Sequence, residues 1–235
     1  MKVIVNSIIL VCTCSFLISC KEDIEPAALR NGSEFLPVSI GNEWIYNQTE
    51  IAYEISGFDT TTTQVRERVV AMDSSLTDVV NFTVEQSTRL SDAVNWQVAS
   101  LYVVKVSNNW ILTQKENKIS TTLDLPVVLD RTWDYYSHSN AASTIVRYSS
   151  NDDAFSQSFD PIFDEVGDEV FVIISDIEQN IVNQNQQYER YIAGVGLVEK
   201  KSIILEFCTV NCQTSGQINT GRFFNKKLIS YNVAD

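Results

Sequence analysis

The chain contains 235 residues, of which 17 are Lys or Arg and 30 are Asp or Glu, so its formal net charge is −13. With 44% hydrophobic residues, its composition is that of a globular domain. The acidic excess argues against nucleic-acid binding, because displacing counterions from phosphates requires a basic surface. The only histidine, His138, excludes a metal site with two imidazole ligands. We therefore expect neither a nucleic-acid partner nor a cofactor.

The N-terminus has the pattern of an export signal. Lys2 is the only charged residue before an apolar run that reaches residue 19, which is too short to span a bilayer. The run ends in Leu17-Ile18-Ser19-Cys20, which resembles the lipobox of bacterial lipoproteins. We expect residues 1–19 to be a lipoprotein signal peptide and Cys20 to carry acyl chains, palmitate among them. The alternatives are a plain secretory signal and an N-terminal membrane anchor.

The segment after the lipobox predicts how the folded domain is attached to the membrane. Because an acidic body is repelled by anionic lipid, membrane attachment must come from the lipid on Cys20. Lys21-Glu22-Asp23 resembles the short export signal of surface lipoproteins in Bacteroidetes-type bacteria. Residues 20–34 have no apolar pattern, and we interpret them as the lipidated cysteine and a flexible tether. We expect an outer-membrane protein, surface-exposed rather than periplasmic.

Residues 35–235 predict a single β-rich domain. Apolar residues alternate with period two in 44–48, 81–85, 95–99 and 169–175, and turn-forming clusters separate such runs. No segment of this body has a capped helical stripe, so we expect few or no helices. A sheet of roughly nine to twelve antiparallel strands must curl to protect its edges. The fold class is therefore all-β, with a strongly curved antiparallel sheet, a half-barrel or a sandwich, and a change of direction near Pro126.

Three short segments carry a family resemblance. The opening Phe35-Leu36-Pro37, followed by Gly41-Asn42-Glu43-Trp44-Ile45-Tyr46, resembles the start of a group of uncharacterised Bacteroidetes lipoproteins. The segments 191–198, with Gly194-Val195-Gly196-Leu197-Val198, and 228–231 resemble the end of that group. The resemblance implies a half-barrel-like envelope domain and no particular activity. In physical terms, Gly41-Asn42 predicts a tight turn, and the glycines at 194 and 196 predict a bend.

Candidate chemistry is sparse. His138 lies in a polar loop without a catalytic signature, and the acids between 152 and 169 predict a solvated loop rather than a Ca²⁺ site. Asp59-Thr60-Thr61 resembles a Bacteroidetes O-glycosylation acceptor, which makes Thr60 a candidate. Five aromatic residues could form a sugar platform or pack in the core, and the core interpretation is favoured. They are Trp96, Trp110, Trp133, Tyr135 and Tyr136.

Two cysteines follow in the body of the chain. Cys208 and Cys212 would lie about 13 Å apart in a straight strand, which is too far for a disulfide. Because an exported protein meets an oxidising compartment, we expect the chain to turn between them and the two thiols to be bonded. The alternative is two free thiols.

These observations rank three functions. The first is a lipid-anchored envelope protein with a non-enzymatic binding or accessory role toward an unknown protein or polysaccharide. The second is a half-barrel carrier or sensor of a hydrophobic ligand, and the third is a hydrolase, for which no pair of acids stands out. An empty apolar cavity of several hundred Å³ would favour the carrier, whereas a filled core would exclude it.

Overall fold

The structure is a computed structural model that describes residues 31–76, 78–150, 168–210, 212, 214 and 216–233. The predicted signal peptide, Cys20 and nearly all of the tether lie outside the described residues, as do most of the acids between 152 and 169. Asn31–Asp235 forms one compact unit. Among the described residues, no helix has the length and hydrophobicity needed to cross a membrane.

The unit consists of one antiparallel sheet, which confirms the all-β prediction. Apart from a 3₁₀ turn, η1 (Ser33–Phe35), the described ranges contain no helix. The twelve strands are β1 (Glu43–Glu54), β2 (Gly57–Leu76), β3 (Val79–Arg89), β4 (Gln97–Val106), β5 (Trp110–Lys115), β6 (Lys118–Asp124), β7 (Thr132–Asp134), β8 (Ile145–Ser149), β9 (Glu169–Gln179), β10 (Asn183–Ile192), β11 (Gly196–Phe207) and β12 (Ile218–Asn232).

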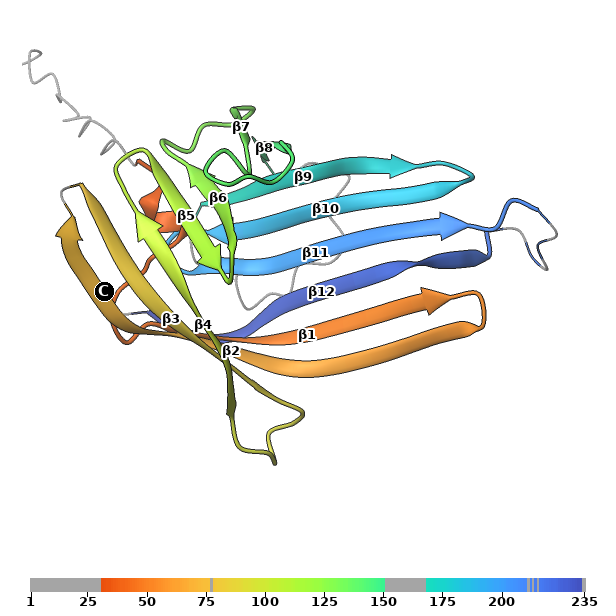
Figure 1. Cartoon of the computed structure of the whole chain (residues 1–235), viewed down its shortest axis with the longest axis horizontal. Helices are drawn as coiled ribbons and strands as arrows, with labels where there is room; N and C mark the ends of the chain where they lie inside the picture. The colour runs from red at the N-terminus through yellow and green to blue at the C-terminus, as the bar shows by residue number, and fades with distance from the viewer. Residues whose placement is uncertain are drawn as a thin grey trace, which may run out of the picture. The chain divides into compact units, whose positions relative to one another are not determined.

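The strands form a meander that begins and ends in the middle of the sheet. Their order is β6-β5-β4-β3-β2-β1-β12-β11-β10-β9-β8-β7, so the chain runs outward from β1 to β6, crosses to β7 and returns to β12 (Figure 1). The crossing follows Asp124 and contains Pro126, where the sequence predicts a change of direction. The two edges of the sheet are therefore consecutive strands, β6 and β7.

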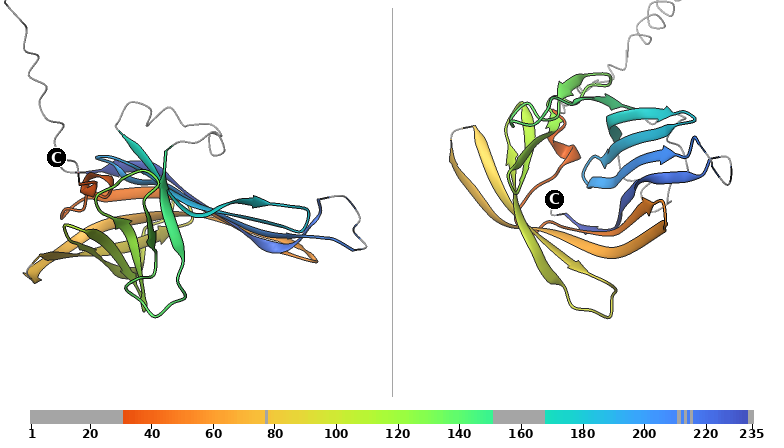
Figure 2. Two further views of the ribbon diagram at one scale, coloured as in Figure 1. Left: turned by 90° about the horizontal axis from the view of Figure 1, so that it is seen from above. Right: turned by 45° about the vertical axis from the view of Figure 1, so that its right-hand side comes forward.

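The sheet curls until these edges meet. β2 is 20 residues long, and it pairs with β1 through its first part and with β3 through its second. Register shifts interrupt the ladders at Ile45/Tyr46, Val69/Ala71 and Arg190/Tyr191, and such bulges bend strands. Figure 2 shows the resulting curl. The backbone N–H of Thr121 donates to the carbonyl of Tyr135 at 2.7 Å across the junction, so the half-barrel is nearly closed.

Three of the four strands predicted from alternation lie inside observed strands, and the fourth is partly wrong. The predictions at 44–48, 81–85 and 169–175 fall within β1, β3 and β9, whereas the prediction at 95–99 starts too early. Asn95 and Trp96 precede β4, because the Trp96 ring packs under the guanidinium groups of Arg66 and Arg89, at 5.0 and 4.3 Å. Trp96 therefore contacts two arginines at its ring face and takes no part in strand pairing.

The segments behind the family resemblance meet in space. The indole Nε1 of Trp44 donates to the carbonyl of Val195 at 2.6 Å, and the N–H of Gly194 donates to the carbonyl of Glu34 at 2.9 Å. Gly41 has a φ of 93° in the turn before β1, and Gly196 has a φ of 105°. The predicted turn and bend are confirmed, and both segments have a structural role.

Candidate ligand-binding site

The concave side of the sheet bears a cavity of about 710 Å³ that is open to solvent on one side. Every second side chain along each strand faces inward, and the apolar side chains among them form part of the cavity wall. These residues are Leu36, Val38, Trp44, Tyr46, Val84, Tyr102, Val104, Tyr135, Tyr136, Ile174, Tyr191, Leu197 and Phe224. The cavity therefore lies beside the core and is continuous with it.

A polar row crosses this wall in register. Glu189 on β10 lies opposite Lys200 on β11, Lys200 lies opposite Lys226 on β12, and Lys226 lies opposite Gln48 on β1. All four side chains line the cavity. Two lysines directly opposite each other repel, so the row needs compensating carboxylates.

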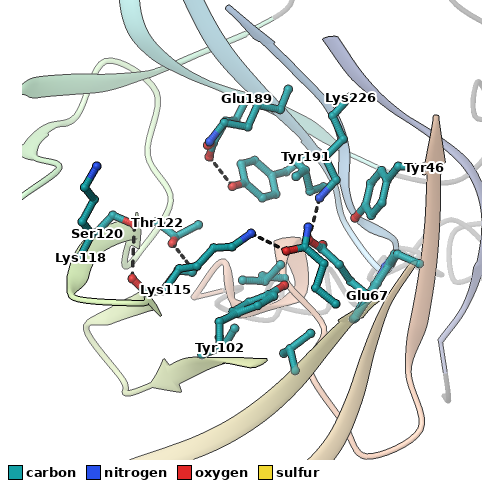
Figure 3. A pocket seen from close by; sticks show the side chains of 18 of the residues that line it. Tyr46, Glu67, Tyr102, Lys115, Lys118, Ser120, Thr122, Glu189, Tyr191 and Lys226 are labelled. Carbon is teal, nitrogen blue, oxygen red and sulfur yellow. Dashed lines mark hydrogen bonds and ion pairs between the residues drawn. The ribbon is translucent and has the colours of Figure 1, made fainter. Parts of the chain in front are cut away.

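Two carboxylates supply that compensation (Figure 3). The ammonium group of Lys226 donates to Glu67 Oε1 at 2.7 Å, and the ammonium group of Lys200 donates to Glu189 Oε1 at 2.6 Å. Glu67 and Lys226 are both buried, and Lys226 Nζ also lies 4.0 Å from the ring centroid of Tyr46. Each lysine of the row thus has one carboxylate partner.

Tyrosine hydroxyl groups complete the surroundings of Glu189. The Tyr191 hydroxyl donates to Glu189 Oε2 at 2.6 Å, and the Tyr135 hydroxyl donates to Oε1 at 3.4 Å. Burial, reinforced by the charge of Glu189, raises the pKa of Tyr135 to about 12. Burial by itself would raise the pKa of Glu189, but the Lys200 ammonium and the hydrogen bonds hold this pKa below its ordinary value. Glu189 is therefore an ionised, fully hydrogen-bonded carboxylate.

The opposite wall carries two further lysines. Lys115 and Lys118 face each other across the β5–β6 hairpin, and both are exposed at the border of the cavity. The ammonium group of Lys115 donates to Gln86 Oε1 at 2.6 Å and lies 5.6 Å from the ring centroid of Tyr102. Partial burial lowers the pKa of Lys115, and the charges of Lys226 and Lys200 lower it further against the opposing effect of Glu67.

Most residues singled out in the sequence lie elsewhere. Cys208 and Cys212 form the expected disulfide in the β11–β12 loop, with 5.7 Å between their Cα atoms. Thr60 is exposed on β2. His138 lies in a loop, where its Nδ1 is 3.2 Å from Thr121 Oγ1. In the part of the chain that is described, no group of three or more His, Cys, Asp or Glu side chains could hold a metal ion.

The aromatic residues separate into two groups. Trp133 and Tyr135 are buried in the core, as the favoured interpretation predicts. Trp96 and Trp110 are half-buried and lie outside that core, and the Trp110 ring is tilted against the ring of His138 with 5.4 Å between centroids. Of the five, only Tyr135 and Tyr136 line the cavity.

The charged residues of the cavity were missed in the sequence. Their signal is a charge at an inward-facing position of an otherwise apolar strand. Glu67 shows it clearly, since it stands between Val65 and Val69, which are both buried. Glu189 shows the signal less clearly, since it has a buried apolar neighbour on the same face on one side only, Tyr191, two positions later.

Comparison with known proteins finds similarity to solved structures only. A candidate lipoprotein from Parabacteroides distasonis ATCC 8503 is 11% identical with a TM-score of 0.36, over 84% of this chain and 98% of that one. A candidate exported protein with a YmcC-like fold from Bacteroides fragilis NCTC 9343 is 11% identical with a TM-score of 0.35, over the same shares of the two chains. No protein-family model and no curated protein matches the sequence. Similarity at this level assigns no function.

Proposed function

We propose that the protein is a lipid-anchored binding protein of the cell envelope whose half-barrel holds an amphipathic small molecule, as a carrier or a sensor. The supporting observation is the cavity of about 710 Å³. Sites for small molecules commonly measure roughly 300–1,000 Å³ and combine apolar walls with a few convergent polar groups. A domain built only for stability would fill such a space with side chains, because protein cores are close-packed.

The proposed role is non-enzymatic. A hydrolase that uses two carboxylates needs one of them protonated as a general acid, with a raised pKa. Glu189 has the opposite environment, since Lys200 and Tyr191 hold it ionised. Glu67 is occupied by Lys226 at 2.7 Å. The two buried acids of the cavity, Glu67 and Glu189, thus favour a structural and recognition role over proton transfer.

Purification tests the binding role. A soluble form that starts at Lys21 retains the whole compact unit, so it keeps every contact described above. Native mass spectrometry of this form, expressed with an export signal, should detect a non-covalent adduct, and organic extraction should release it. A protein that is free of adducts and binds no amphiphile in calorimetry would contradict the proposal.

The proposed anchor is lipid, palmitate included, on Cys20, and the proposed location is the outer surface of the outer membrane. Replacing Cys20 with Ala should move the protein from the membrane to the soluble fraction, because the acidic body has no other attachment. Sedimentation with membranes after a high-salt wash would contradict a single anchor. Protease added to intact cells should digest the wild-type protein, and protection alongside digestion of a known surface protein would indicate a periplasmic location.

A second candidate function, binding of a protein partner, is favoured by three hairpin ends. The β1–β2, β9–β10 and β11–β12 connections lie at one end of the long strands (Figure 1). They carry apolar side chains that are largely exposed: Ile55 and Phe58, Ile181, and Val210. Exposed apolar groups gathered in this way are typical of interaction surfaces. Serine substitutions at Ile55 and Ile181 should abolish capture of such a partner and leave ligand binding in the cavity unchanged.

A further inference from the structure

The charges that line the cavity do not balance. Lys200 and Lys226 are neutralised by Glu189 and Glu67 in two short ion pairs. Lys115 and Lys118 remain on the positive side, and among the described residues the lining contains one further acid, Glu50. Glu50 is exposed on β1 and accepts a hydrogen bond from Gln48 Nε2 at 2.8 Å. The cavity thus has an excess of positive charge in a chain whose net charge is −13.

The excess lies on the β5–β6 hairpin. Lys115 and Lys118 are direct partners in the β5–β6 ladder, and Figure 3 shows the Lys115 ammonium group directed into the pocket and that of Lys118 directed away from it. Within the described residues, no carboxylate lies at ion-pair distance from either ammonium group, and Lys115 donates only to the neutral amide of Gln86. A bound anion would give the Lys115 ammonium group the negative partner that it lacks among the described residues.

The surroundings of Lys115 indicate what else the anion must carry. The ring of Tyr102 lies 5.6 Å from its ammonium group, and Val84 and Val104 border the same cavity from β3 and β4. Figure 3 shows the Lys115 side chain directed toward the centre of the pocket, with Tyr102 beside it. A small hydrated anion would leave this apolar wall in contact with water, whereas a molecule with an acidic head and an apolar body would cover it.

We propose that the ligand is an amphipathic anion whose acidic head group binds the ammonium group of Lys115, with Lys118 close by on the same hairpin, and whose apolar part lies against the aromatic and aliphatic wall of the cavity. This inference rests on the proposed function, since it names the class of molecule that the cavity holds. The lowered pKa of Lys115 agrees with it, because its main cause is partial burial of the ammonium group, and a bound anion would compensate for that loss of water.

Calorimetry with matched amphiphiles tests the inference on the soluble form that starts at Lys21. Dodecanoate, dodecyl phosphate, dodecyltrimethylammonium and dodecyl maltoside share one apolar chain and differ in the head group, and each is used below its micelle concentration. We expect the two anions to bind at least tenfold more tightly than the cation and the neutral compound. Acetate and inorganic phosphate, which lack the chain, should bind at least tenfold more weakly than the matching amphiphiles.

Substitutions then assign the head group to the two lysines. The double variant Lys115→Gln/Lys118→Gln should lose about tenfold or more in affinity for the anions, as expected for a lost charge-assisted hydrogen bond, and should bind the neutral compound as before. Lys105→Gln is the matched control, because it removes the same charge from β4 next to the cavity-lining Val104 but on the other face. It should change no affinity by more than about twofold.

The outcomes separate the two proposals. Equal affinity for anionic, cationic and neutral heads, or anion binding that survives the double variant, overturns the inference and leaves the carrier function standing. Failure of every dodecyl compound to bind overturns the carrier function itself. Binding of inorganic phosphate as tight as that of dodecyl phosphate would show a plain anion site and would also overturn the inference.

Discussion

Gly196 lies where the beginning and the end of the folded unit meet. Its φ is 105°, and a Cβ atom built on it would stand 3.2 Å from the indole Nε1 of Trp44. That Nε1 donates the 2.6 Å hydrogen bond to Val195, across 151 positions of sequence. The glycine is therefore required both for its backbone conformation and for the close approach of the indole.

Replacing Gly196 with Ala should destabilise the protein by about 2–3 kcal/mol, because the positive φ costs roughly 1–2 kcal/mol and the indole must also move. Chemical unfolding of the purified soluble form measures the difference. Gly194→Ala is the matched control, since Gly194 has a φ of 77° but no atom within 4 Å of the added Cβ. It should cost only about 1 kcal/mol. Equal losses in the two variants would contradict a role for the Trp44 contact.

The sequence predicted the bend at Gly194 and Gly196 but not its partner. Two glycines before an apolar strand indicate positive φ from local chemistry alone. The hydrogen bond from Trp44 depends on β1 and β12 pairing in the middle of the sheet, which brings the motif near the start beside the motif near the end. Local patterns contain no information about that pairing. The same limit applies to Glu34, whose carbonyl accepts from the N–H of Gly194.

At the scale of the strand, an ionised residue breaks the apolar alternation of β2. Val65, Glu67 and Val69 all face inward and are buried, and Glu67 is tolerated because β12 presents Lys226 at 2.7 Å. Breaking such a pair leaves a buried charge without a partner, which costs more than the intact pair contributes. The ion pair therefore links β2 and β12, which share no ladder because β1 lies between them.

Glu67→Gln should lower the free energy of unfolding by about 3 kcal/mol, because Lys226 stays buried without its carboxylate. The double variant Glu67→Gln/Lys226→Met should recover a large part of this loss, as no charge is left unpaired. Asp92→Asn is the control, since the Arg89–Asp92 pair is formed by an aspartate with 79% of its side chain exposed. It should cost less than about 1 kcal/mol. A double variant that is less stable than Glu67→Gln would refute this account.

Tyr135 makes the stability of the sheet sensitive to alkaline pH. Its pKa is raised to about 12 in the folded protein by burial and by Glu189, whereas an unfolded tyrosine has a pKa near ~10. Between these values the unfolded chain releases the phenol proton and the folded protein retains it, so stability is full below pH ~10 and falls as pH rises toward 12. This residue alone makes the free energy of unfolding fall by up to about 1.4 kcal/mol per pH unit. Urea unfolding between pH 9 and pH 12 should show a fall in stability to which other buried tyrosines such as Tyr148 and Tyr188 also contribute, and Tyr135→Phe should reduce its slope by about the share of this one residue. An unchanged slope would contradict the assignment.

The strands β1, β3 and β9 could be located from the sequence because alternation is a local signal. Trp44 and Tyr46 in β1 and Phe82 and Val84 in β3 alternate with less buried neighbours, as expected for a sheet with one buried face. Trp96 misled the same argument, because its ring is covered by two arginines of neighbouring strands instead of by the core. Alternation shows which side chains share a face, and it does not show what covers that face.

At the scale of the whole molecule, the cavity depends on how far the sheet curls. The sequence predicted a curved sheet but left open whether its core is filled, because the enclosed volume depends on bulges and on the junction of the two edges. Glu189 on β10 and Lys226 on β12 share the cavity wall because β11 lies between these two strands and pairs with both. The cavity and its charges are therefore consequences of topology, which local patterns do not contain.

The junction between β6 and β7 decides whether the cavity keeps its shape. Besides the backbone bond from Thr121 to Tyr135, the indole Nε1 of Trp133 donates to the carbonyl of Thr121 at 2.9 Å, and the Trp133 ring packs on Tyr148 with 4.4 Å between centroids. Side chains thus join two edges that have no continuous ladder between them. An indole whose N–H crosses the junction contributes more to closure than its packing alone.

Trp133→Phe should therefore lower the free energy of unfolding by about 2 kcal/mol, from a smaller ring and from a buried carbonyl that loses its donor. The amide of Thr121 should exchange with solvent faster relative to amides in β1 and β12, because the edges separate locally before the sheet unfolds. Trp110→Phe is the matched control, since Trp110 is half-buried and, among the described residues, its indole N–H bonds to no neighbouring strand. It should leave Thr121 exchange unchanged. If Trp133→Phe accelerated exchange equally in β1, β12 and at Thr121, the junction would not be a separate unit of stability, and the closure of the half-barrel would have to come from the sheet as a whole.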